Sequence, residues 1–154
     1  MHNGKEYSLR RLAAELKNIS PADLKIVDAR CDSKRIVELD EADRKIAAAQ
    51  IVFTGTCLTG CNTPSTDAFM DALCEEILIF ITEFGYSDLT EEEINLSLRI
   101  NCKGGYKFES GLDIRPIQFT GYTFNVNFLA DVLSNYISIR KMLDRKFQNF
   151  IDGY

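Results

Sequence analysis

The apolar positions near the start of the chain have the spacing of an amphipathic helix. Ser8 is placed to cap such a helix, because a serine oxygen ahead of the first turn accepts from a backbone N–H that has no helical partner. Residues three and four apart share one helix face. The apolar positions here are Leu9, Leu12, Leu16 and Ile19. We therefore expect a helix over residues 9–19.

A second helix is predicted over residues 21–30. Ser20 has the N-cap position and Pro21 the first helical position, where the missing N–H of proline loses no hydrogen bond. The segment is short, and Leu24–Val27 also has the composition of a strand. The strength of the cap favours the helix.

A third helix is expected after Asp32 or Ser33, either of which can cap it. Its apolar residues again fall three and four apart: Leu39, Ala42, Ile46, Ala49 and Phe53. We expect this stripe to face the core. Residues 54–66 are mostly small and polar, which predicts a loop.

The fourth helix is predicted to supply the centre of the core. Ser65 or Thr66 can cap it, and Asp67 and Asp71 in its first turns suit the positive end of the helix dipole. The side chains that its spacing turns inward are Phe69, Leu73, Ile77, Phe80 and Phe84. We expect the first four to be nearly fully buried, against the third helix and the last one.

Gly85 is placed to end the fourth helix, and Thr90–Glu93 opens a fifth with a capping box. In such a box the threonine hydroxyl accepts from the N–H of Glu93, and the glutamate accepts in return from the N–H of Thr90. The helix should end at Lys103–Gly105. Residues 106–119 alternate apolar and polar positions, which predicts a small β-hairpin or two short extended arms.

The last helix is predicted to be the longest, and it starts at Asn125 or Asn127. Its seam is Leu129, Val132, Tyr136, Ile139, Leu143 and Phe150, with Phe147 beside it. Together these elements predict a mainly α fold in a single domain over residues 1–154. We expect an irregular bundle of five to six helices, with the hairpin or extended insert before the long C-terminal helix.

The charges of the chain are divided by region. Between Lys45 and Arg99 every charged residue is an acid: Asp67, Asp71, Glu75, Glu76, Glu83, Asp88, Glu91, Glu92 and Glu93. The rest of the chain is net positive, so the overall charge of −5 comes from this middle third. A surface of this sign repels phosphate, which leaves only a local basic patch for contact with nucleic acid.

The composition is that of an ordinary globular domain, with 45% apolar and 27% charged residues. Five cysteines at irregular spacing argue against a secreted disulfide framework and for a reducing cytoplasm. The N-terminus has no apolar signal region. The longest apolar run, Ala72–Ile81, contains two glutamates and is too short to cross a bilayer. We expect a cytoplasmic protein without membrane contact.

Cys57 and Cys61 are the pair that invites a metal hypothesis, because thiolates at this spacing can share one zinc ion. A structural zinc site needs four ligands, and the only histidine is His2. We therefore expect no metal and no cofactor. Glu91–Glu93 are explained by the capping of their helix. Without a phosphate loop or a nucleophile elbow, we expect no enzymatic activity.

Four basic residues of the last helix are the candidate contacts for nucleic acid or a partner: Arg140, Lys141, Arg145 and Lys146. Lys141 and Arg145 are one helical turn apart, so a basic stripe is expected. The simpler interpretation is a solvated face that pairs in part with Asp144 and neighbouring acids. The nearby aromatic residues fall on the seam, which favours a place in the core over stacking on bases.

Five segments follow one another in an order that is known from other proteins: Phe84–Tyr86, Leu89–Leu96, Asn101–Gly104, Phe124–Leu129 and Val132–Tyr136. This order resembles small helical proteins of unknown function that bacterial prophages and mobile elements encode beside replication genes. The resemblance covers about a third to a half of the chain. The chain departs from that set in its longer insert, Glu109–Thr123, and in its N-terminal region.

The resemblance implies an accessory protein of DNA replication, such as a helicase-loader-like adaptor, and carries over no catalytic residue. The leading hypothesis is a non-enzymatic adaptor of a phage or mobile-element replication module that binds a replication protein. The alternative is a small DNA-binding regulator that uses the basic face of the last helix. A third, a metal protein or enzyme centred on Cys57 and Cys61, has the least support. The oligomeric state stays open.

Overall fold

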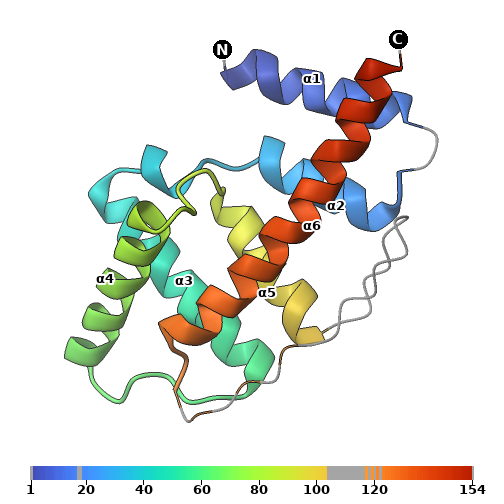
Figure 1. The fold of residues 1–154 in the computed structure, drawn as a ribbon. Coiled ribbons are helices and arrows are strands. Elements are labelled where there is room, and N and C mark those ends of the chain that lie inside the picture. Colours follow the sequence, from blue (N-terminus) through green and yellow to red (C-terminus); the bar gives the residue numbers. More distant parts are fainter. Residues whose placement is uncertain are drawn as a thin grey trace.

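The structure is a computed structural model that describes residues 2–16, 19–103, 117, 119, 121 and 123–153. Over these ranges it is a bundle of α-helices joined by short connections (Figure 1). The elements in chain order are α1 (His2–Glu15), α2 (Pro21–Cys31), the 3₁₀-helix η1 (Ile36–Glu38), α3 (Glu41–Thr59), α4 (Asp67–Glu83), α5 (Glu91–Lys103) and α6 (Val126–Asp152). The prediction of a mainly α fold with a long C-terminal helix is confirmed.

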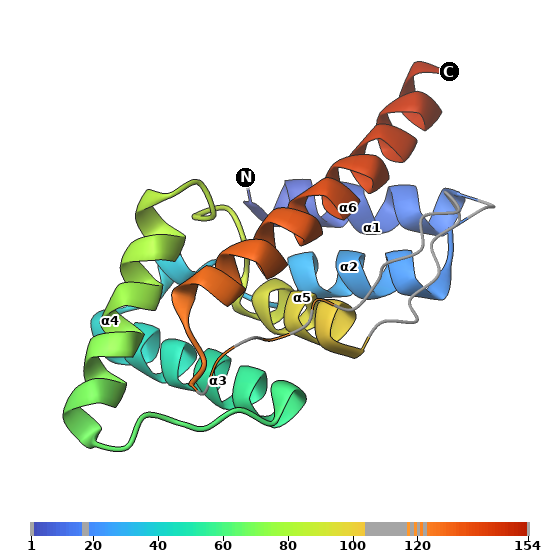
Figure 2. The ribbon, with the colours of Figure 1, turned by 60° about the horizontal axis from the view of Figure 1, so that its bottom comes forward.

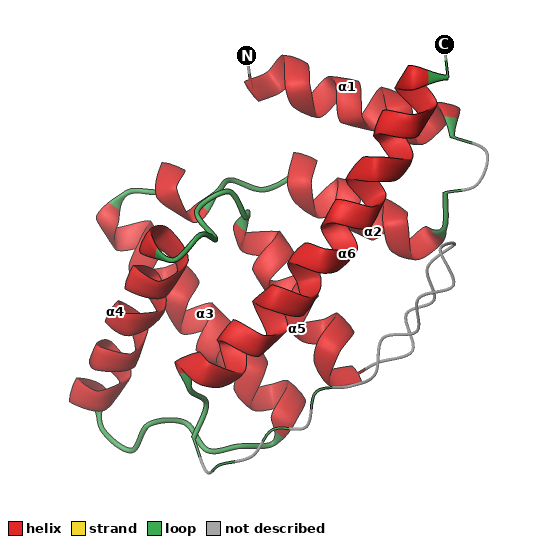
Figure 3. Cartoon of the chain, viewed as in Figure 1, coloured by secondary structure: helices red, strands yellow, loops and turns green. Residues whose placement is uncertain are grey.

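No β-strand is present in the described part of the chain, where Figure 3 draws only helices and loops. Two isolated β-bridges join Arg35 to Thr90 and Asn62 to Thr123. The predicted hairpin or extended insert over residues 106–119 lies outside the described residues, apart from Ile117 and Phe119. No helix of the described ranges is both long and apolar enough to cross a bilayer.

Helix α5 lies inside the bundle and packs against α2, α3 and α6. Its side chains Ile94, Leu98 and Ile100 are fully buried. The long α6 crosses the bundle and extends beyond it toward α1 (Figures 1 and 2). Figure 2 shows α3 at one edge, with α5 and α6 on the same side of it. One broad face of α3 therefore points away from the other helices of the described ranges.

The predicted caps are confirmed where the interacting groups are close in sequence. The Ser20 hydroxyl accepts from the N–H of Asp23 at 3.1 Å, and the Thr66 hydroxyl from the N–H of Phe69 at 3.2 Å. Asn125 caps α6. The capping box of α5 is also present, and Gly85 follows α4 with a φ of 95°. These bonds satisfy N–H groups that a helix leaves without partners.

Two predicted helix starts are wrong. Ser8 lies inside α1, which begins at His2. Helix α3 begins at Glu41 with Asp40 as its cap, so neither Asp32 nor Ser33 caps it. The Ser33 hydroxyl instead accepts from the N–H of Glu92, at the start of α5. A residue that reads as a local cap thus serves a helix far along the chain.

The predicted loop over residues 54–66 is also too long, because α3 continues to Thr59.

Gly55 lies inside α3, where a larger residue would not fit. A Cβ atom at this position would collide with the ring of Phe124, which is itself buried. The missing side chain lets the ring lie directly against the helix backbone.

The predicted inward faces of α3 and α4 are wrong, although the helices themselves are confirmed. Ile46 and Phe53 on α3 are 57% and 66% exposed, and Phe69 on α4 is 66% exposed. The residues of α3 that are buried are Ala47, Ala48, Ile51, Val52 and Gly55. On α4 the buried residues are Cys74, Ile77 and Ile81, so Ile77 is the one correct core prediction of its set, and Leu73 and Phe80 are half-buried.

The inward side of α3 differs from the predicted one because this helix has apolar residues on two opposite faces. Alanine and glycine on the inner face let neighbouring helices approach more closely than phenylalanine would. On α6 the predicted seam from Leu129 to Leu143 is confirmed as buried. The roles of two phenylalanines are exchanged, because Phe147 is buried and Phe150 is half-buried.

Candidate functional site

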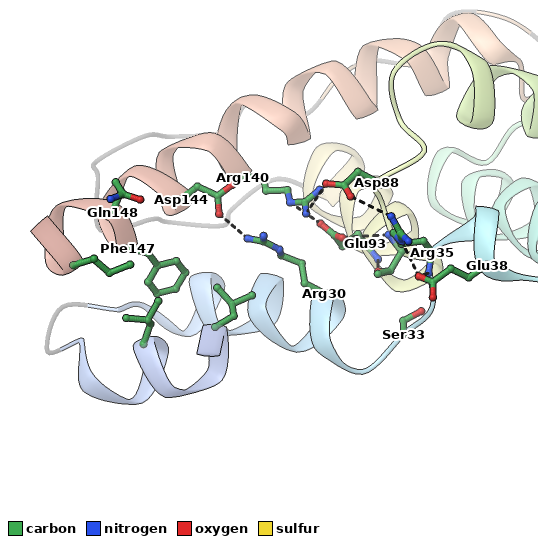
Figure 4. Close-up of a pocket in the computed structure, with 14 residues that line it drawn as sticks. Arg30, Ser33, Arg35, Glu38, Asp88, Glu93, Arg140, Asp144, Phe147 and Gln148 are labelled. Atoms are coloured by element: carbon green, nitrogen blue, oxygen red, sulfur yellow. Dashed lines mark hydrogen bonds and ion pairs between the residues drawn. The ribbon is translucent and has the colours of Figure 1, made fainter. Parts of the chain in front are cut away.

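A cleft of about 450 Å³ lies between α1, the segment after α2, and the C-terminal half of α6 (Figure 4). One end of its lining is apolar and the other is charged. Its apolar residues are Leu9, Leu12, Phe147 and Ile151. Its charged residues are Arg30, Arg35, Glu38, Asp88, Glu93, Arg140 and Asp144.

Each arginine of the cleft faces a carboxylate of the same cleft. Arg140 lies between two acids, 3.5 Å from Asp88 and 3.4 Å from Glu93, and its side chain is 12% exposed. The guanidinium of Arg30 contacts Asp144 at 2.8 Å. Figure 4 shows these side chains pointing toward one another from α2, α5, α6 and the segment before α5. The arginines therefore enter the cleft with their charge already compensated.

Glu93 is the buried centre of this network. Its Oε1 accepts from the N–H of Thr90 at 3.2 Å, and its Oε2 accepts from the Tyr136 hydroxyl at 2.7 Å. Burial raises the pKa of Glu93 above its usual range, although Arg140 and Tyr136 both favour the charged carboxylate. Burial, together with the neighbouring Glu93, also raises the pKa of Tyr136, so its hydroxyl keeps its proton and remains a donor.

The sequence predicted only the capping role of Glu93. Its contact with Tyr136 spans 43 positions of the chain, and no local pattern announces a contact of that range. One signal was present: Tyr136 lies on an otherwise aliphatic part of the seam, and a buried tyrosine hydroxyl needs a hydrogen-bond partner.

The chemistry available in the cleft is that of a structural junction. The Thr90 hydroxyl donates to the carbonyl of Ala29 at 2.7 Å, and Ser33 caps the N–H of Glu92. Both hydroxyls are thus engaged with the backbone rather than with a base that would activate them. The hydrogen bonds and ion pairs join α2, α5 and α6. These contacts stabilise the fold.

The structure separates the four basic residues predicted as one face. Arg140 points into the cleft, and Lys146 lies 3.3 Å from the buried carboxylate of Asp23. Lys141 and Arg145 are exposed. Asp144, the expected partner of this face, contacts Arg30 instead. The predicted basic stripe is therefore reduced to two outward side chains one turn apart.

Cys57 lies in the last turn of α3, where it is exposed, and Cys61 follows the helix end. The thiol of Cys61 lies 4.0 Å from the Thr56 hydroxyl. Within the described ranges, no group of three or more histidine, cysteine or acidic side chains is arranged to hold a metal ion.

A second surface is formed by the side of α3 that points away from the bundle. We call it the outward α3 face, and it consists of Ala42, Ile46, Phe53 and Cys57. All four side chains are exposed. On the neighbouring α4, Phe69 is 66% exposed as well, and Phe84, which directly follows that helix, is 66% exposed too. Most of the large apolar side chains that are exposed in the described part therefore lie on α3, on α4 or directly after α4.

Helix α4 also carries most of the exposed acids of this region: Asp67, Asp71, Glu75, Glu76 and Glu83. Among the described residues no ion pair reaches any of these five carboxylates. The apolar surface and the uncompensated negative charge thus occupy adjacent helices.

Comparison of the chain with protein-family models, curated proteins and solved structures gives no match.

Proposed function

We propose that this protein is a cytoplasmic, non-enzymatic adaptor that acts by binding another protein, in the replication module of a phage or mobile element. The observation that carries the proposal is the outward α3 face, where Phe53 is 66% exposed and Ile46 57%. Apolar surface of this kind gains about 25 cal/mol per Å² when a partner removes it from water. Apolar residues grouped on one face mark interaction sites more often than apolar residues scattered singly.

The cleft supports the same proposal from the other direction. Its arginines are paired with acids, and its hydroxyls are bonded to the backbone. These groups serve the fold, so the described cleft supplies no activated nucleophile for an enzymatic role. The replication context rests on the resemblance of Leu89–Leu96 and the segments around it to proteins encoded beside replication genes.

The test is an affinity purification of the tagged protein from its native host, read by mass spectrometry. We expect a helicase, a helicase loader or a primase to be enriched over a tag-only control. A stable complex that contains only proteins of another cellular process would contradict the proposal. The interaction must be reproduced with the two purified proteins by size-exclusion chromatography.

A DNA-binding regulator is the second candidate, and one observation favours it. Lys141 and Arg145 are exposed and one turn apart on α6, as a contact with the DNA backbone requires. Two cations neutralise few phosphates, and the net charge of the chain is −5. The adaptor is therefore the better supported of the two, and measurement of DNA affinity separates them.

A further inference from the structure

We propose that the outward α3 face is the docking surface for an amphipathic helix whose apolar seam is flanked by lysine or arginine. This inference rests on the proposed function, because it names the surface of the adaptor and the chemical class of its partner. The partner helix would lie along α3 and would be steered there by the carboxylates of α4.

The spacing of the outward α3 face is that of a helix–helix seam. Ala42, Ile46, Phe53 and Cys57 follow one another at intervals that keep them on one side of the helix, with the half-buried Ala49 between them. Apolar positions four and three apart are the pattern that receives the side chains of a second helix. The opposite side of α3 is already occupied, since Ala48, Ile51 and Val52 are fully buried in the core.

The charge of the neighbouring helix α4 favours a basic occupant. The carboxylates of α4 lie on the helix that packs beside α3, and in the described part no cation is paired with them. The cations of α3 itself are engaged. Arg44 donates to the carbonyls of Val37 and Leu39 at 2.8 and 3.0 Å, and Lys45 lies 3.9 Å from Glu41. Complementary charge raises association rates and excludes acidic competitors.

The same charge argues against a second copy of this chain as the occupant. A symmetric dimer would place the same patch of both protomers face to face. Two copies of the acidic α4 would then be brought near each other without a compensating cation. Repulsion between like charges opposes that arrangement.

The inference is tested with two synthetic helical peptides labelled with fluorescein. Both carry leucine at the seam positions; one carries lysine at the flanking positions and the other glutamate. Fluorescence anisotropy is measured against the full chain at low and at physiological salt. We expect the lysine peptide to bind more tightly at low salt, and the glutamate peptide to bind at least about tenfold more weakly.

Variants then locate the binding. Phe53→Ser should weaken binding of the lysine peptide by about tenfold or more, as the loss of a central apolar contact does at interfaces. Leu24→Ser is the matched control, because Leu24 is an exposed apolar residue of α2, away from this face. Asp71→Asn combined with Glu75→Gln should reduce the salt dependence of binding. Circular dichroism checks that each variant remains folded.

The inference would be overturned if the wild type and Phe53→Ser bound the lysine peptide with equal affinity. It would also be overturned if Leu24→Ser lost as much affinity for this peptide as Phe53→Ser does. Sedimentation of the wild type as a dimer that becomes a monomer in Phe53→Ser would overturn it as well, because the face would then belong to a second copy. The proposed function fails separately. If the protein forms a complex with a replication protein and Phe53→Ser does not weaken that complex, the proposed function stands and this docking surface is wrong. If the lysine peptide binds in a Phe53-dependent way but no replication protein is found, the docking surface stands and the proposed role in a replication module is wrong.

Discussion

The hydroxyl of Tyr136 donates to Oε2 of Glu93 across 2.7 Å and joins the middle of α6 to the first turn of α5. Both residues are fully shielded from water. The other oxygen of the same carboxylate caps α5 through the N–H of Thr90. The Glu93 side chain therefore caps the start of α5 and also fastens α5 to α6. We expect the loss of this side chain to lower the stability of the whole bundle.

Tyr136→Phe should lower the free energy of unfolding by about 1–3 kcal/mol, because it leaves a buried carboxylate oxygen without its hydroxyl donor. Urea denaturation followed by circular dichroism measures this change. Tyr86→Phe is the matched control, since Tyr86 is half-buried and packs through its ring against Phe80. We expect that control to stay within about 0.5 kcal/mol of the wild type. Equal effects of the two substitutions would contradict the structural role of the Tyr136 hydroxyl.

Glu93 should make stability depend on pH. Burial raises the pKa of Glu93 in the folded state above its ordinary value of 4.5. The folded state then holds this proton more firmly than the unfolded chain does. The stability that this group contributes is fully present below the unfolded pKa and is lost as pH rises through the folded pKa. We expect the free energy of unfolding of the wild type, minus that of Glu93→Gln, to fall as pH rises from below 4.5. A difference that rises over this range would refute the assigned direction.

Gly55→Ala should destabilise the protein even though alanine is the better helix former. The gain in helix propensity is about 1 kcal/mol, whereas forcing a methyl group into a packed contact costs about 1–3 kcal/mol. The methyl group would collide with the ring of Phe124. Urea denaturation of both single variants and the double variant with Phe124→Leu gives the coupling. The penalty of Gly55→Ala should shrink in the Phe124→Leu background, and an unchanged penalty would place the clash elsewhere.

The rotation of α4 can be tested with two truncations of large apolar residues. Ile77→Ala should cost about 2–5 kcal/mol, because it removes buried surface and leaves a cavity. Phe69→Ala should change stability by no more than about 0.5 kcal/mol, because that ring is 66% exposed. Thermal or urea unfolding distinguishes the two. If Phe69→Ala were the more damaging substitution, the inward face predicted from spacing would be correct after all.

DNA affinity is expected to be weak. With Arg140 and Lys146 engaged inside the fold, Lys141 and Arg145 are the outward cations of this face. We expect no binding to duplex DNA tighter than about 10⁻⁶ M at physiological salt, which is within the range of non-specific binding. Electrophoretic mobility shift or anisotropy measures it. Nanomolar, salt-sensitive binding that Lys141→Glu and Arg145→Glu abolish would favour the regulator over the adaptor.

The capped helix starts were predictable because each cap is local. Ser20, Thr66 and Asn125 all accept from an N–H three residues further along the chain. A bond of that range depends on neighbouring residues alone. Two caps were predicted wrongly: Ser8 lies inside α1, and the hydroxyl of Ser33 accepts from the N–H of Glu92, which is too distant in sequence for a local pattern to connect the two.

The positions of the site residues were less predictable, because a basic side chain on a helix can lie either at the surface or in the interior. Arg140 and Lys141 are consecutive, yet one lies beside Glu93 and the other is exposed. The direction of each side chain follows from the angle at which α6 crosses its neighbours. That angle results from packing along the whole seam and is absent from any short pattern.

The sequence by itself determined that the protein is mainly helical, where several of its helices begin and end, and that its middle third is acidic, because propensity, capping and charge are local properties. Only the tertiary structure decided which face of α3 is inward. The alternatives were the face that carries Ala48, Ile51 and Val52 and the face that carries Ile46 and Phe53. Close packing against α4 and α5 selected the first face, where alanine and glycine let the neighbouring helices approach, and left Ile46 and Phe53 at the surface, which created the candidate interaction face.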